Sequence, residues 1–234
     1  MIERRWTGTG FGQAQDLGIA IGADEAVQTH FAPGSAVMVY AASTLSESAF
    51  LASSFDQGVA SRRLQFRRRL DNGAWSAAAF LPVPGAAPVG GEAKPALAAC
   101  PKGQPGCPLN GEVYAVWLRG TEPDPFSLAT EVWGARYVNG LWQDVRRLAN
   151  PGLGSDQLPR VTYRNGQPVV SFVRQPARDL SAAGQRRLML LRVGVDSQPI
   201  DTQAPDGVIW QQSAPAGDRR PARAAGFALP GRPQ

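Results

Sequence analysis

The sequence predicts an all-β fold built from repeated four-stranded antiparallel sheets, and two observations predict it. Of the 234 residues, 43% are hydrophobic and only 18% are charged, with 26 Gly and 20 Pro, which is typical of short strands joined by tight turns. Asn-Gly followed two residues later by Trp also occurs twice, in "NGAW" and "NGLW". Asn-Gly between apolar runs predicts a hairpin, because both central residues of a type I′ turn need positive φ.

These signals belong to a repeat. Four of the six tryptophans keep one register: Trp6, Trp75, Trp142 and Trp210. Successive members are 69, 67 and 68 residues apart. The stretch "EAVQTHFAPGSAVMVY" also aligns without a gap on "QLPRVTYRNGQPVVSF", which places Gly34 on Gly166. A period of this length indicates one supersecondary unit per repeat.

Each repeat is predicted to hold four strands, A to D. Strand A follows Asp24, Glu92 or Asp156, and strand B follows Gly34, Gly111 or Gly166. Strand C runs into the Asn-Gly turn, and strand D begins at the Trp and ends near Leu81 or Leu148. The predicted repeats are residues 23–83, 84–150 and 151–212, preceded by an outer strand of a partial repeat in 1–22 and followed by a disordered tail in 213–234.

Antiparallel four-stranded units at this period are typical of β-propeller blades. The strands "VMVY", "VYAVW" and "PVVSF" are nearly continuously apolar, as strands between two neighbouring blades should be. Three blades and one extra strand are fewer than the about four to eight that close a propeller. We therefore expect an incomplete ring, completed by further blades of a longer chain or by another copy.

The Trp turns "LDNGAW" and "YVNGLW" resemble those of bacterial β-propeller repeats of the sialidase and Asp-box type. The Asp-box spacing Ser-x-Asp-x-Gly-x-Thr-Trp is not matched, so the resemblance implies the scaffold and not the catalytic motifs of sialidases. We expect the four repeat tryptophans to pack between blades, and Gly73 and Gly140 to form the turns before strand D.

Three acidic residues recur at the same place in the repeat. Asp24, Glu92 and Asp156 each precede strand A, in connections that share one face of a propeller. Carboxylates gathered there would bind a cation such as Ca²⁺ or the hydroxyls of a sugar. The alternative is that they are solvated loop acids. No other cofactor is expected.

The connections between strands B and C are long, dissimilar and on that same face, where recognition is usual. In the second of them, Glu122 and Asp124 with Phe126 provide two carboxylates and an aromatic platform, a combination that suits a saccharide. Two such carboxylates would also serve as a general acid and base.

The two cysteines, Cys100 and Cys107, lie in the insertion of the second repeat. With a single histidine, His30, they are too few for a structural zinc site. A disulfide across six Pro- and Gly-rich residues is expected, with free thiols as the alternative. The disulfide would place the chain in an oxidising compartment, secreted, periplasmic or on the cell surface, although no signal peptide begins at Met1.

The charge of +5 comes from 22 Arg and two Lys. The consecutive Arg67, Arg68 and Arg69 alternate between the faces of a strand, so they do not form the basic patch that nucleic acid needs. Apolar runs are too short to span a membrane. We therefore predict a non-catalytic binding or scaffold propeller segment for a glycan or protein ligand. The alternative is a fragment of a sialidase-like glycoside hydrolase.

Overall fold

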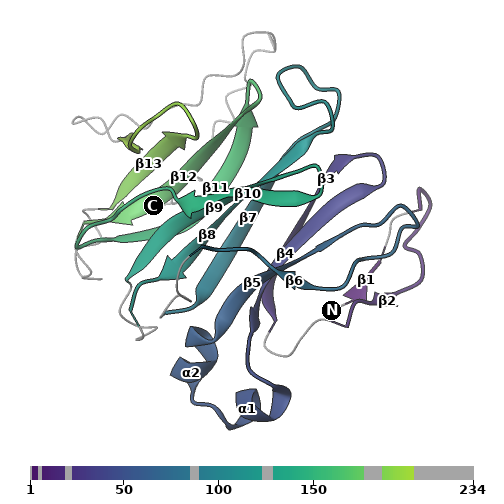
Figure 1. Ribbon diagram of the computed structural model, residues 1–234, viewed down its shortest axis with the longest axis horizontal. Helices are drawn as coiled ribbons and strands as arrows, with labels where there is room; N and C mark the ends of the chain where they lie inside the picture. Colours follow the sequence, from purple (N-terminus) through teal and green to yellow (C-terminus); the bar gives the residue numbers. More distant parts are fainter. Residues whose placement is uncertain are drawn as a thin grey trace, which may run out of the picture. The chain divides into compact units, whose positions relative to one another are not determined.

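The computed structural model describes residues 2–4, 7–18, 23–84, 90–122, 129–176 and 186–202. It is an all-β structure with three four-stranded antiparallel sheets, each of which follows the chain order of its strands (Figure 1). The predicted four-stranded meanders are therefore confirmed. We call them the first, second and third sheets.

The strands fall at the predicted places after the acidic residues and glycines. The first sheet contains β3 (Asp24–Ala32), β4 (Ser35–Ser43), β5 (Arg62–Arg68) and β6 (Ala79–Phe80). The second contains β7 (Glu92–Cys100), β8 (Glu112–Gly120), β9 (Thr130–Val138) and β10 (Leu141–Arg147). The third contains β11 (Ser155–Arg164), β12 (Gln167–Gln175), β13 (Arg187–Arg192) and β14 (Ile200–Asp201).

Two six-residue helices, α1 (Glu47–Ala52) and α2 (Phe55–Ala60), lie between β4 and β5. They were not predicted, because six residues are too few to show the periodicity of an amphipathic helix. Ser46 and Ser54 cap the helices, and Ser54 forms a reciprocal capping box with Gln57. Neither helix has the length and apolarity that a membrane crossing needs, within the residues that the structure describes.

The sheets stack face to face in chain order, and two apolar cores lie between them. We call the face toward the following sheet the forward face, and the opposite one the rear face. On strand B, the forward-face residues are Val37, Val39 and Ala41 in the first sheet and Tyr114, Val116 and Leu118 in the second. The rear-face residues of the second and third sheets are Val113, Ala115, Trp117, Val170 and Phe172.

The first strands of the three sheets are neighbours. β3 contacts β7, and β7 contacts β11, while the fourth strands lie at the opposite edges of their sheets. Polar contacts reinforce this arrangement, since Lys94 on β7 donates hydrogen bonds to Glu25 on β3. The sheets therefore approach one another most closely along strand A.

The two Asn-Gly turns differ. Asn139 and Gly140 both have positive φ and connect β9 directly to β10, as predicted for a type I′ turn. Gly73 also has positive φ, but Asn72 does not, and its side chain accepts a hydrogen bond from the Ala74 amide. The prediction of a two-residue I′ turn at 72–73 is therefore wrong, because the Asn side chain stabilises a wider loop instead.

The tryptophans at these turns are buried. Trp142 packs in the core between the first and second sheets, with its ring centroid 5.7 Å from that of Phe66. Trp75 packs on the rear face of the first sheet with Met38 and Tyr40. Trp75 forms an isolated β-bridge with Arg69 and is not part of a strand. The regular strand β6 begins later, at Ala79, so strand D does not start at this Trp.

Trp6 and Trp210 lie outside the described residues. The fourth strand of the third sheet, β14, precedes Trp210 in the sequence, so this tryptophan does not begin it. The residues of the predicted tail, 213–234, are also outside the described ranges.

The N-terminal segment forms a small hairpin of β1 (Ile2–Glu3) and β2 (Gln15–Asp16), where one outer strand was predicted. Glu3 joins it to the first sheet, because its carboxylate accepts hydrogen bonds from Arg69, at 2.7 Å, and from the Trp75 indole, at 2.9 Å. Leu17 covers part of the rear face.

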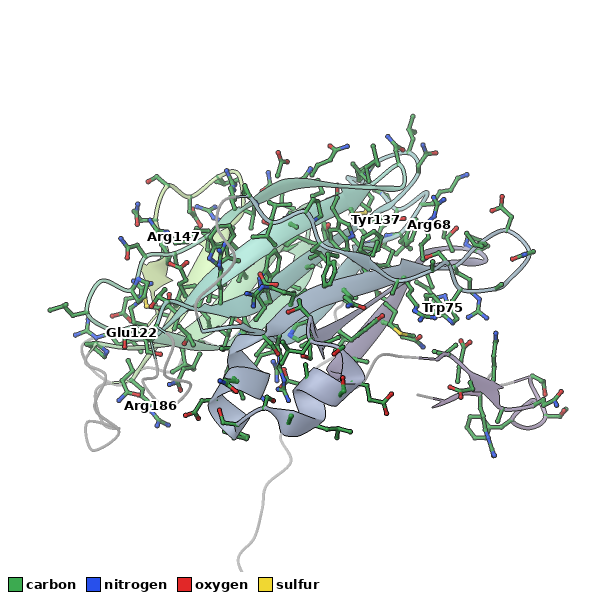
Figure 2. The ribbon with its side chains drawn as sticks, turned by 60° about the horizontal axis from the view of Figure 1, so that its bottom comes forward. Arg68, Trp75, Glu122, Tyr137, Arg147 and Arg186 are labelled. Carbon is green, nitrogen blue, oxygen red and sulfur yellow. A yellow bond between two sulfur atoms is a disulfide. The ribbon has the colours of Figure 1, made fainter. Side chains whose placement is uncertain are left out.

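The three consecutive arginines point to different partners, as expected for a strand. Arg67 donates to the carbonyl of Gly18 and Arg69 to Glu3, both on the rear side of the first sheet. Arg68 hydrogen bonds Tyr137 of the second sheet, and Figure 2 shows these two side chains together. The absence of a basic patch at this position follows from the alternation.

Cys100 and Cys107 form a disulfide, with their Cα atoms 5.4 Å apart. The loop that it closes contacts both neighbouring sheets. Lys102 donates its backbone N–H to Phe31 of β3, and Gly106 packs against the Asn165-Gly166 turn of the third sheet. The insertion of the second repeat therefore connects the strand A-to-B ends of all three sheets.

We predict that replacing Cys100 and Cys107 with Ser lowers the free energy of unfolding by about 2–3 kcal/mol, because the disulfide closes a short loop. Denaturant unfolding of the oxidised protein and the variant measures this difference. Mass spectrometry of the oxidised protein should show one linked peptide pair, and two alkylated thiols in folded protein would contradict the prediction.

We further predict that Gly166→Ala is much more destabilising than Gly152→Ala. Both glycines have positive φ, so each substitution carries the left-handed strain of about 1–2 kcal/mol. A Cβ at Gly166 would lie 1.9 Å from the Gly106 carbonyl oxygen, whereas Gly152 has open space. The close approach should add about 1–3 kcal/mol, and equal unfolding free energies for the two variants would refute the contact.

Candidate functional site

The connections between strands B and C and between strands D and A lie at one end of the sheets, which we call the loop end. Their backbones are in contact. Gly120 exchanges backbone hydrogen bonds with Gly90 and Gly91, and Gly91 also packs against the Val59 carbonyl at the end of α2. Figure 2 shows Glu122, Arg147 and Arg186 toward this end, and Arg68 and Trp75 toward the opposite one.

The helical hairpin α1–α2 is the largest described element of the loop end. It presents apolar side chains to solvent, since Leu51 is 74% exposed and Phe55 is 68% exposed. Serine caps at both helices fix its backbone. Sequence reasoning identified the loop as variable but missed the helices, although Ser54 followed by Gln57 is a capping-box signal.

Glu92, at the start of β7, is buried rather than solvated. One carboxylate oxygen accepts a hydrogen bond from the Leu64 amide of the first sheet, at 2.9 Å, and the other accepts one from the Trp117 indole, at 3.3 Å. Burial raises the pKa of Glu92, although the positive charges of Arg119 and Arg63 act in the opposite direction. The carboxylate joins the first and second sheets.

Asp156, in β11, is also buried. Arg174 on the neighbouring strand binds it with two hydrogen bonds, of 2.7 and 2.9 Å. Thr130 of the second sheet donates to the Asp156 backbone carbonyl. Burial raises the pKa of Asp156, with Arg174 opposing this effect.

The third acidic residue, Asp24, begins β3, but the structure does not describe its side chain. All three acids thus occupy equivalent places at the loop end. The two carboxylates that the structure describes are buried and hydrogen bonded, Glu92 to the Leu64 amide and Asp156 to Arg174. Within the described residues, no group of three or more His, Cys, Asp or Glu side chains has the spacing of a metal site. A cation or sugar role for these acids stays a prediction.

Sequence reasoning missed the arginines opposite these acids. Arg119 and Arg174 pair in register with Glu92 and Asp156, and each stands eight residues after its strand-turn glycine, Gly111 or Gly166. The repeat alignment contained this signal.

Arg119 is held over an aromatic ring. Its guanidinium carbon lies 4.6 Å from the Trp133 ring centroid, and the Trp133 indole donates to Glu131 at 2.7 Å. Arg147 forms an ion pair of 3.3 Å with Glu131. At the loop end of the second sheet, charged side chains and one indole therefore contact one another in the order Arg119, Trp133, Glu131 and Arg147.

Of the three candidates in the connection after β8, Glu122 is described and half-buried, and its backbone packs against Gly90. Asp124 and Phe126 lie outside the described residues, so their arrangement with Glu122 stays a prediction.

His30 is exposed on β3.

A tyrosine–carboxylate pair lies at the opposite end of the sheets. The Tyr163 hydroxyl donates to Glu112 at 2.7 Å, beside Arg136, which lies 3.4 Å from the same carboxylate. Burial and the hydrogen bond to Glu112 raise the pKa of Tyr163, so its hydroxyl stays protonated. This is the opposite of what a phenolate nucleophile requires.

The Glu92→Gln variant should show how the buried carboxylate depends on pH. Because the folded-state pKa of Glu92 is raised, its contribution to stability is fully present below the unfolded value near 4.5 and is lost as pH rises through the raised pKa. Gln cannot ionise, so the stability of the variant relative to wild type should increase from pH 4.5 to 8.

Urea unfolding at several pH values measures this difference. Glu47→Gln, on the exposed helix α1, controls for the removal of one carboxylate. Parallel stability curves for wild type and Glu92→Gln would contradict the assignment.

Comparison with known proteins assigns no family to this arrangement. No protein-family model matches the sequence, and no curated protein matches it. The functional interpretation therefore depends on the stacked sheets, the loop end and its charged pairs.

Proposed function

We propose that this chain is a β-propeller segment that binds a glycan or protein ligand, without catalysis, through its loop end. The observation that carries this proposal is that the first strand of the second sheet, β7, contacts the first strands of both neighbouring sheets, β3 and β11. Blades arranged around an axis approach one another along their inner strands and diverge toward their outer strands.

The loop end has the features of a recognition surface. Its base is rigid, because Glu92 and Asp156 fix the junctions between consecutive sheets. Its connections differ in length and composition, and the α1–α2 hairpin presents exposed apolar side chains on a backbone whose last residue, Ala60, accepts a hydrogen bond from Arg63. Exposed apolar groups beside charges are typical of ligand-contacting loops on a fixed scaffold.

The glycoside-hydrolase alternative is less well supported. Such enzymes need carboxylates that face the substrate, and the described candidates Glu92 and Asp156 are engaged inside the sheet contacts. The Tyr163–Glu112 pair is partly buried between the second and third sheets. A binding function requires none of these groups to be released.

We also propose that the protein works in an oxidising compartment, at the cell surface or secreted. The Cys100–Cys107 disulfide supports this location, since such bonds persist outside the reducing cytosol.

A glycan array, combined with a protein-interaction screen, tests the binding function. The double variant Leu51→Ala/Phe55→Ala should weaken binding of the recognised glycan or protein by roughly tenfold or more, because exposed apolar anchors dominate such contacts. Leu109→Ala removes a leucine that is even more exposed, at the opposite end, and should leave binding unchanged.

Equal affinities of wild type and the α1–α2 variant would exclude this hairpin as the contact. Hydrolysis of a fluorogenic sialoside, abolished by Tyr163→Phe, would instead support the hydrolase alternative.

A further inference from the structure

The forward faces of the three sheets correspond residue by residue, because their strands pair in the same register. On strand C, Leu64, Val132 and Leu188 occupy the same place, and each carbonyl accepts a hydrogen bond from the residue directly after strand D. Leu64 and Val132 are 1% and 0% exposed, whereas Leu188 is 42% exposed. The following sheet covers the first two residues, and among the described sheets none covers the third.

The exposed forward face of the third sheet has an apolar area on strands B to D. Leu188 pairs with Val173 on β12, and Leu190 pairs with Ile200 on β14. Ile200 is 51% exposed, and Val173 and Leu190 are half-buried. Adjacent exposed apolar side chains on one flat face are typical of a surface that another molecule covers.

Strand A of the same face is basic and polar. Arg160, Thr162 and Arg164 are all exposed there. Strand pairing places Arg160 where Val27 stands in the first sheet and Ala96 in the second. The strand that is apolar at both filled junctions is therefore positively charged at this one.

The charges of Arg160 and Arg164 are not balanced. Three other arginines of the third sheet form ion pairs with aspartates: Arg174 with Asp156, Arg187 with Asp201 and Arg192 with Asp196. Arg160 donates to the carbonyl of its neighbour Pro159, and no described acidic residue pairs with Arg160 or Arg164. The exposed face thus carries two unpaired positive charges along β11, beside its apolar area.

The two filled junctions show what kind of surface covers a forward face. In each, the covering sheet has an apolar strand B, with Val113, Ala115 and Trp117 in the second sheet and Val170 and Phe172 in the third. The first strands meet, since β3 contacts β7 and β7 contacts β11. A sheet that covers the third one in this way would place its first strand against β11 and its second strand against the apolar area.

We propose that the forward face of the third sheet binds a β-sheet of a partner protein that has carboxylates on the strand facing β11 and apolar side chains on the next strand. Carboxylates are the complement of Arg160 and Arg164, because a guanidinium binds them with two parallel hydrogen bonds. The opposite charges set the orientation of the partner, and burial of Leu188 and Ile200 contributes to affinity.

The first sheet of a second copy does not have this chemistry. The rear face of its strand A carries Gln28 and His30, which offer no carboxylate. Its strand B is already covered, since Met38 and Tyr40 are 3% and 0% exposed in one cluster with Leu17. The proposed contact is also separate from the loop end, so it does not depend on the binding function proposed above.

Two cyclic β-hairpin peptides serve as probes for this surface. Both carry valines on one strand, and the other strand carries glutamates in the first peptide and lysines in the second. Fluorescence anisotropy with labelled peptides should show that the full-length protein binds the glutamate peptide tighter by roughly tenfold or more, because like charges across a contact oppose binding. Higher salt should reduce this preference.

Substitutions on the face should change this binding, and matched substitutions elsewhere should not. Arg160→Glu should abolish the preference for the glutamate peptide, whereas Lys102→Glu makes the same charge change at an exposed position of the disulfide loop and should leave it intact. Leu188→Ser should weaken binding of the glutamate peptide by roughly tenfold. Leu109→Ser, at a leucine 90% exposed outside this face, should leave it unchanged.

Failure of the wild-type protein to bind either peptide, or equal affinities for the two, would overturn the proposal. A dimer seen by light scattering that Leu188→Ser dissociates would also overturn it, because a second copy would then occupy the face. Absence of any glycan or protein ligand at the loop end, with binding of the glutamate peptide intact, would overturn only the function proposed above.

Discussion

The structure depends on a strand that is apolar on both faces. In β8, Val113, Ala115 and Trp117 face the first sheet, while Tyr114 and Val116 face the third. Each of these side chains is buried almost completely. Such a strand is stable only between two covering sheets, because either face alone would expose a continuous apolar surface to water. The second sheet thereby fixes the positions of its two neighbours.

Polar groups define how far the sheets can slide along this apolar contact. Glu92 binds a backbone amide of the preceding sheet, and Thr130 binds a backbone carbonyl of the following one. Side-chain packing tolerates small shifts, but a buried carboxylate must retain its donors. Each sheet junction therefore has polar contacts at the loop end that set its register.

Most of the fold was predictable from residues whose type indicates a particular backbone conformation. Gly34, Gly111 and Gly166 have positive φ and mark the starts of strand B, and the Asn139-Gly140 turn formed as expected. The wider loop at Asn72 was not predictable, because it depends on a side-chain hydrogen bond. The short helices escaped notice since their signal is in the caps and not in hydrophobic periodicity.

The candidate site was less predictable than the fold. Spacing correctly placed Glu92 and Asp156 at the starts of strand A, but their burial depends on partners distant in sequence, Leu64 and Arg174. No local pattern in a single sequence contains such pairings. Likewise, the exposure of the apolar residues Leu51 and Leu188 becomes known only when the neighbouring sheets are placed.

The disulfide loop limits how this repeat can change by duplication. Gly106 packs against the Asn165-Gly166 turn so closely that a Cβ on Gly166 would lie 1.9 Å from the Gly106 carbonyl oxygen, and the Lys102 amide donates to the Phe31 carbonyl on the other side. The middle sheet is consequently specific to its place between these two neighbours. An additional copy of it, inserted elsewhere in the series, would bring its loop against turns that lack these contacts. Duplication of a whole sheet is therefore expected to start from the outer sheets.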